Sequence, residues 1–109
     1  MPRPKRSGIR LGAKMAKGYW IAHVTVTDPV QYQKYVEASR AAFVKYGAAM
    51  LARGGAFEQM DGEGHARNVV IEFATLQQAK DCYNSPEYQH AKSLRKDAGI
   101  ANLVLVEGV

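Results

Sequence analysis

The order of strand-like and helix-like segments constrains this chain more than any other feature. Residues 19–27, YWIAHVTVT, and 67–74, RNVVIEFA, are rich in β-branched and aromatic side chains that alternate with period two. Each is followed by a helical pattern. A weaker strand-like segment lies at 48–60 and another at 101–107. The order β-α-β-β-α-β predicts an α+β protein with the ferredoxin-like fold.

Capping motifs mark the starts of the predicted helices. Asp28 and Ser85 each precede a proline, an arrangement typical of an N-cap followed by the first helical residue. These pairs begin helical patterns over 29–46 and 86–98. A further helix over 76–83 stops just before the second pair, so the second helix is predicted to be broken in two. The break lets this segment turn over a small sheet.

One face of the predicted sheet has no cover within a single chain. The ferredoxin-like fold has an antiparallel sheet of order 4-1-3-2 with both helices on one face. The other face is expected to carry Ile21, Val70, Val104 and Val106. An apolar face of this size favours association, and a second copy related by a two-fold axis is the simplest cover. The sequence therefore predicts a homodimer that pairs sheet to sheet as a dimeric α/β barrel, with a cavity between the sheets.

Two glycines interrupt the weakest strand-like segment. Gly54 and Gly55 stand in the middle of 48–60, which predicts a bulge or a close approach of the backbone there. The glycine- and acid-rich residues 61–66, DGEGHA, predict the turn into the following strand.

The net charge of +5 belongs to the first residues of the chain. Residues 1–17 contain basic side chains and no acidic one, whereas 18–109 are close to neutral. The expected organisation is a flexible basic tail over 1–17 and one domain over 18–109. The tail is either a solvated leader, with Met15 as an alternative start, or an arm that touches nucleic acid or anionic lipid.

Cysteine content and hydropathy exclude several classes of protein. Cys82 is the single cysteine, so an intramolecular disulfide and a cysteine-based metal site within one chain are excluded. A cytoplasmic location is expected. No apolar run is long enough to cross a membrane. The histidines lack ligand spacing and no nucleotide-binding motif occurs, so neither a metal nor a cofactor is predicted. Glu72 on the open face argues against specific RNA binding.

His23 and Glu72 are the candidate catalytic pair. Both are expected on the open face of neighbouring strands, where a carboxylate near a histidine suits proton abstraction and return. The alternative is a polar pair that fixes strand register or the dimer interface.

Five other residues are candidates for ligand binding. Arg53 would hold a substrate carboxylate if it points inward, and is otherwise an exposed charge. Asn84 and Ser85 lie at the helix break, where amide groups could bind an anion, or they simply cap the helix. Tyr83 and Tyr88 are expected in the core or the cavity wall rather than as catalysts.

Several segments resemble one known family. LARGG at 51–55, IEFATLQQAKDCYNSPEYQHAKSLR at 71–95 and LVEGV at 105–109 are similar to the domain of unknown function 1330 family, and the similarity runs from about Tyr19 to Val109. The resemblance implies a dimeric α/β barrel of the superfamily that includes muconolactone isomerases and antibiotic-biosynthesis-type monooxygenases. It implies no particular reaction. Ala74-Thr75 replace the usual proline and serine, which we interpret as a change of helix cap.

Two hypotheses of function follow. The first is a small enzyme that performs cofactor-free acid–base chemistry, isomerase- or lyase-like or monooxygenase-like, on a small anionic or partly apolar metabolite. The second is a noncatalytic homodimeric module that binds a ligand or a partner.

Overall fold

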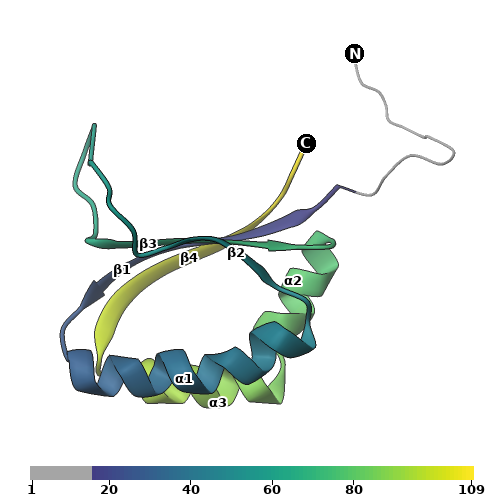
Figure 1. The fold of residues 1–109 in the computed structure, drawn as a ribbon, viewed down its shortest axis with the longest axis horizontal. Coiled ribbons are helices and arrows are strands. Elements are labelled where there is room, and N and C mark those ends of the chain that lie inside the picture. The colour runs from purple at the N-terminus through teal and green to yellow at the C-terminus, as the bar shows by residue number, and fades with distance from the viewer. Residues whose placement is uncertain (1–15) are drawn as a thin grey trace, which may run out of the picture.

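The computed structural model describes residues 16–109, which form a layer of strands and a layer of helices (Figure 1). In chain order the elements are β1 (Gly18–Val26), α1 (Pro29–Lys45), β2 (Ala49–Arg53), β3 (Arg67–Phe73), α2 (Leu76–Tyr83), α3 (Pro86–Arg95) and β4 (Gly99–Glu107). This is the predicted ferredoxin-like order with the second helix in two pieces. The predicted basic tail falls almost entirely on residues 1–15, which lie outside the described residues.

The sheet is antiparallel with the order β2-β3-β1-β4, as predicted. In the centre of the sheet, Ile21 of β1 lies between Val70 of β3 and Val104 of β4. Because alternate side chains of a strand point to opposite faces, these three residues share one face. The helices all lie on the other side of the sheet (Figure 1). The apolar face is therefore open within the chain, as expected.

Side-chain caps begin all three helices. Asp28 Oδ1 accepts a hydrogen bond from the Gln31 backbone N–H at 3.1 Å. Thr75 and Ser85 use their hydroxyl oxygens in the same way at the starts of α2 and α3. The first amides of a helix have no partner inside it, so each cap satisfies a donor that would otherwise be unpaired. The capping residues predicted from the sequence are confirmed.

Two boundaries differ from the prediction. β2 is only five residues long, and its irregular pairing lies between Met50 and Ala52 rather than at the glycine pair. Gly54 has a φ of 68°, a left-handed conformation that ends the strand and that glycine adopts most easily. Residues 54–66 then project to the side away from the helices (Figure 1). At the other boundary α3 stops at Arg95, and Gly99 begins β4 instead of only closing the helix.

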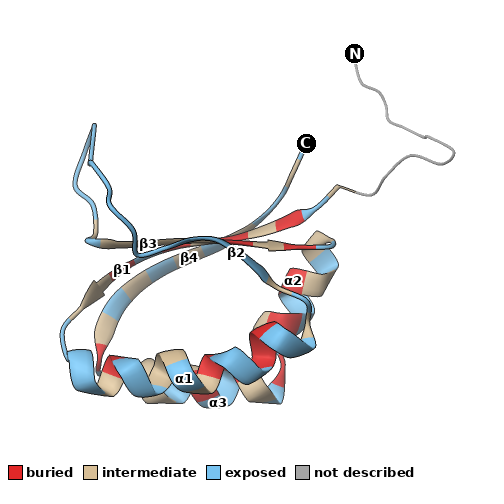
Figure 2. Cartoon of the chain, viewed as in Figure 1, coloured by how far each residue is buried: buried red, intermediate tan, exposed pale blue. Residues whose placement is uncertain are grey.

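The core is an aromatic cluster around Trp20, on the helix side of the sheet. The Trp20 ring meets Tyr88 edge to face at 4.8 Å between centroids and Phe43 at 5.2 Å, and stacks on Phe73 at 6.1 Å. Edge-to-face pairs of this kind stabilise a core by about 0.5–1.5 kcal/mol beyond area burial. Buried residues accordingly gather where helices and sheet face each other (Figure 2).

Candidate functional site

A cavity of about 220 Å³ lies between the sheet and the helices, next to the aromatic core. Most of its lining residues are apolar or aromatic, and the rings among them are those of Trp20, Tyr32, Tyr35 and Phe43. The cavity lies on the helix-covered face of the sheet within one chain. It is thus separate from the cavity predicted from the sequence between the sheets of two copies.

Four arginines line this cavity, and they are all the arginines of residues 16–109: Arg40, Arg53, Arg67 and Arg95. They come from α1, the end of β2, the start of β3 and the end of α3, so four elements converge here. Arg67 and Arg95 are half-buried, whereas Arg40 and Arg53 are exposed. No described lysine lines the cavity. A guanidinium is planar and binds carboxylates with two parallel hydrogen bonds, so this concentration of arginine is typical of an anion site.

These guanidinium groups have no carboxylate partner among residues 16–109. The ion pairs found there join Lys17 to Glu72 and Lys45 to Glu87, and no aspartate or glutamate lines the cavity. The Nε atoms of Arg67 and Arg95 are buried and have no hydrogen-bond partner in the described part of the chain. A buried donor on a charged group is costly to leave unpaired. The cavity therefore has unused capacity to donate hydrogen bonds to an anion.

Tyrosine rings support the two half-buried guanidinium groups. The Arg67 guanidinium carbon lies 5.5 Å from the centroid of the Tyr32 ring, and that of Arg95 lies 5.2 Å from the Tyr35 ring. Cation–π contacts of this type attract the cation to the ring face. Since both tyrosines belong to α1, this helix positions the charges of β3 and α3 around the cavity.

A pair of hydroxyl groups completes the polar part of the site. The Tyr35 and Tyr88 hydroxyl oxygens are 2.9 Å apart, which is a hydrogen bond between α1 and α3. Tyr35 lines the cavity, whereas Tyr88 is fully buried behind it. Burial raises the pKa of both tyrosines above their usual value near 10.0, so both hydroxyls keep their protons at neutral pH.

Comparison with known families supports the resemblance seen in the sequence. The model of the domain of unknown function DUF1330 matches residues 17–109. The chain belongs to the DUF1330 family. The comparison with curated proteins found no match.

Solved structures share the fold of this DUF1330 chain at low sequence identity. A protein of unknown function from Rhodopseudomonas palustris has a TM-score of 0.73 and 14% identity, over 88% of this chain and 85% of that chain. SnoaB, a cofactor-independent oxygenase from Streptomyces nogalater, has a TM-score of 0.59 and 11% identity, over 84% of this chain and 91% of that chain. A dimeric protein of unknown function with a ferredoxin-like fold from Bacteroides fragilis has a TM-score of 0.58 and 17% identity, over 87% of this chain and 99% of that chain. At these identities the likeness shows the fold alone.

The two residues of the predicted catalytic pair lie on the open face, and each forms a hydrogen bond with a different partner. His23 Nδ1 and Asn68 Oδ1 are 2.7 Å apart, and Glu72 accepts a hydrogen bond from the Tyr19 hydroxyl at 2.9 Å. The strand register explains this division, because β3 places Asn68 opposite His23 and Glu72 opposite Tyr19. The Glu72 hydrogen bond raises the pKa of Tyr19. A catalytic role for His23 and Glu72 remains a prediction.

The predicted binding residues are spread over different environments. Arg53 lines the helix-side cavity, as one of the four arginines. Asn84 is exposed and donates to the Lys80 carbonyl. The Ser85 hydroxyl is used twice, since it donates to the Cys82 carbonyl at 2.6 Å and caps α3. None of the remaining candidates at the helix break lines the cavity: Tyr83, Asn84, Ser85 and Tyr88.

Three cavity arginines were not selected from the sequence, although one carried a usable signal. Arg67 has the same strand parity as Val69 and Ile71, so the alternating pattern already put it on the helix side. Arg40 and Arg95 lie on helices, where the choice between solvent and cavity depends on how α1 and α3 pack. That packing is a tertiary property which the local pattern does not contain.

Other kinds of site have no support in the described residues. Residues 16–109 contain no group of three or more His, Cys, Asp or Glu side chains arranged to hold a metal ion. Among these residues no helix has the length and apolar character needed to span a membrane.

Proposed function

We propose that this DUF1330 protein binds a small organic anion with an apolar body in the cavity between its sheet and helices. The observation that carries the proposal is the gathering of every described arginine on an otherwise largely apolar cavity from which acidic side chains are absent. Buried charges in proteins are normally paired. An anionic ligand would supply the missing partner.

The dimensions of the cavity favour a ligand of about one ring. A cavity of roughly 150 Å³ holds benzene, and this one measures about 220 Å³. The ring would lie against the Trp20 and Phe43 side, and the anionic group would face Arg67 and Arg95. Aromatic carboxylates are the simplest molecules with both properties.

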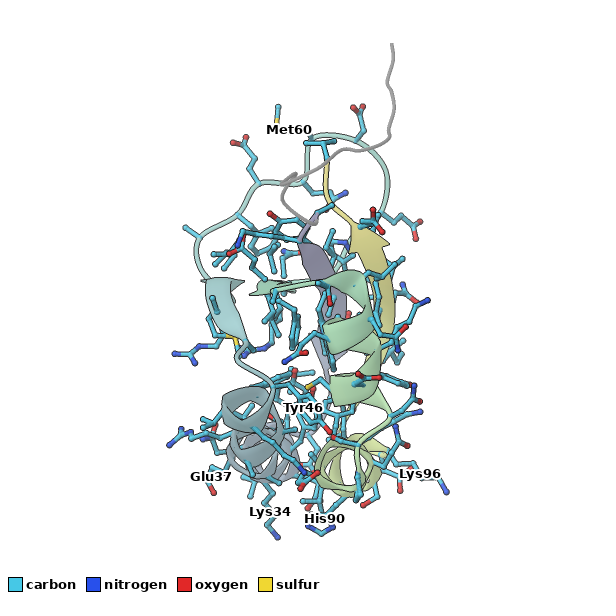
Figure 3. The ribbon with its side chains drawn as sticks, turned by 90° about the vertical axis from the view of Figure 1, so that its right-hand side faces the viewer. Lys34, Glu37, Tyr46, Met60, His90 and Lys96 are labelled. Atoms are coloured by element: carbon cyan, nitrogen blue, oxygen red, sulfur yellow. The ribbon has the colours of Figure 1, made fainter. Side chains whose placement is uncertain are left out.

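A second copy of the chain is the proposed occupant of the open sheet face. Val104 and Val106 are 54% and 44% exposed there, next to half-buried Ile21. The segment 54–66 rises on the same side and carries exposed Phe57 and Met60, the latter near its tip (Figure 3). Exposed apolar surface of this extent is typical of association sites, and the neighbour from Bacteroides fragilis is described as dimeric.

Catalysis is the second candidate function. SnoaB, which shares the fold, is a cofactor-independent oxygenase, and a cavity with fixed positive charges suits reactions that pass through an anion. His23 and Glu72 lie on the opposite face of the sheet from this cavity, so in this hypothesis they would act as acid and base only on a ligand held between the sheets of two copies. The alternative remains a noncatalytic binding module. Turnover of a bound ligand would favour the enzyme, and stoichiometric binding without turnover would favour the module.

Binding of benzoate and benzamide tests the proposed function. The two molecules have nearly the same shape and differ in charge, and Trp20, the single tryptophan, lines the cavity, so its fluorescence reports binding. Benzoate should bind about tenfold or more tightly than benzamide, a difference of about 1.4 kcal/mol. The variant Arg67→Gln should lose most of that preference.

A matched charge change provides the control. Lys34→Gln also removes one positive charge, but Lys34 is exposed on the side of α1 that points away from the sheet (Figure 3). It should leave benzoate affinity within about twofold, because exposed charges at this distance are screened by salt. Equal binding of benzoate and benzamide, or equal losses in Arg67→Gln and Lys34→Gln, would contradict the proposal.

A further inference from the structure

The direction of the hydrogen bond between Tyr35 and Tyr88 follows from their burial. Tyr88 is 0% exposed, and the Tyr35 hydroxyl oxygen is the partner of its hydroxyl at 2.9 Å. If Tyr35 donated this bond, the Tyr88 proton would be buried without an acceptor, at a cost of about 1–3 kcal/mol. We therefore assign Tyr88 as the donor and Tyr35 as the acceptor. This assignment leaves the Tyr35 proton free to point into the cavity.

Two hydrogen-bond donors of the cavity wall then lie near each other. The Tyr35 hydroxyl comes from α1, and the Arg95 guanidinium from α3 lies 5.2 Å from the centroid of the Tyr35 ring. Both line the cavity. A hydroxyl that itself accepts a hydrogen bond becomes a stronger donor, since neighbouring bonds in a chain polarise one another. The chain Tyr88–Tyr35 therefore directs a strengthened O–H donor toward a site that already has a cation beside it.

We propose that Tyr35 and Arg95 together bind an ionised hydroxyl oxygen of the ligand, so that the cavity selects the anions of phenols and enols. The inference rests on the proposed function and names its ligand class. Preorganised hydrogen-bond donors and nearby cations favour the charged form of a bound acid over its neutral form. The ligand proton is released to solvent on binding, and no other reaction is involved.

The other charged and titratable groups that face the cavity either attract the bound anion or do not repel it. Arg40, Arg53 and Arg67 are cations, and Tyr32 contributes the ring that lies against Arg67. No acidic side chain of the described residues lines the cavity to oppose the bound anion. Stabilisation of a phenolate or enolate is also what cofactor-free proton transfer needs. The inference thus connects the binding site with the second candidate function.

The ionisation of bound para-nitrophenol tests this inference. Its phenolate absorbs visible light and its phenol does not, so the apparent pKa of the bound molecule is read directly by titration. In the full-length protein this pKa should lie at least about one unit below the value in water, a tenfold preference for the anion. Tyr35→Phe should remove most of the shift. Tyr88→Phe should reduce it, because Tyr88 acts through Tyr35 as a positioning residue.

The control variant is Tyr46→Phe. Tyr46 follows the end of α1 and does not line the cavity, so the same atom is removed outside the site (Figure 3). A bound nitrophenol that titrates at or above its value in water, or a shift equal in Tyr35→Phe and Tyr46→Phe, would overturn the inference. Benzoate binding on the same samples separates the two proposals. If benzoate binds and nitrophenolate is not favoured, only this inference fails; if benzoate does not bind, the proposed function fails as well.

Discussion

At the scale of single residues, the chemistry of this protein depends on which side of the sheet each polar side chain reaches. Residues of one strand parity, such as Arg67 and Val69, join the cavity and core, whereas Glu72 and Asn68 of the other parity join the open face. A change of one position along β3 would exchange the two environments. The placement of Arg67 in the cavity and of Asn68 and Glu72 on the open face is therefore a direct result of strand register.

Cys82 provides a prediction at this scale. Its side chain is fully buried, and burial raises the pKa of the thiol to about 12. At pH 8 a chromogenic aromatic disulfide should therefore leave the native protein unlabelled, and it should label one thiol per chain in denaturant. Rapid stoichiometric labelling of the native protein would contradict the buried position.

The same shift has a consequence for stability at alkaline pH. In the unfolded chain the Cys82 thiol ionises near pH 8.5, which is a lower pH than in the folded protein. The contribution of Cys82 to the free energy of unfolding is thus fully present below about pH 8.5 and is lost as the pH rises toward about 12.

At the scale of secondary-structure elements, Ser85 holds α2 and α3 together at the break between them. Its hydroxyl donates to the last turn of α2 and accepts from the first turn of α3, and the residue is 3% exposed. Ser85→Ala should lower the free energy of unfolding by about 1–2 kcal/mol, measured by urea denaturation. Ser93→Ala, which removes an exposed hydroxyl of α3, should have less than half this effect. Equal effects would contradict the role of Ser85.

The elements were largely predictable from the sequence because their signals are local. Period-two alternation at β1 and β3 and the side-chain caps at Asp28, Thr75 and Ser85 depend on residues a few positions apart. β2 was predicted with the wrong length. Gly54 ends it by adopting a positive φ, and a glycine pair in a sequence equally permits a bulge or a chain reversal.

At the scale of the whole molecule, the order of elements predicted the sheet topology and the open apolar face. It did not predict the cavity. That cavity depends on the distance between α1 and the sheet and on where Arg40 and Arg95 point, which are set by side-chain packing across elements far apart in the chain. The predicted catalytic pair, His23 and Glu72, consequently lies on the open face and not in this cavity.

Association through that open face is the prediction at this scale. In Val104→Glu the new carboxylate stays solvated in the monomer, because Val104 is 54% exposed. A sheet-to-sheet dimer would bury this charge without a partner. Native mass spectrometry at micromolar concentration should find two chains for the parent protein and one for Val104→Glu. Val30→Glu, at a site 76% exposed on α1, should remain a dimer. A monomeric parent would contradict the proposed dimer.

A crystal structure with bound para-iodobenzoate would test the central claim most directly, because the anomalous signal of iodine locates the ring and the carboxylate is then placed from the map. We predict one site per chain between the sheet and the helices, with the iodinated ring beside Trp20 and the carboxylate within hydrogen-bond distance of Arg67 or Arg95. Iodine found only between two sheets at the open face, beside His23 or Glu72, would contradict the claim that the ligand site is the arginine-lined cavity.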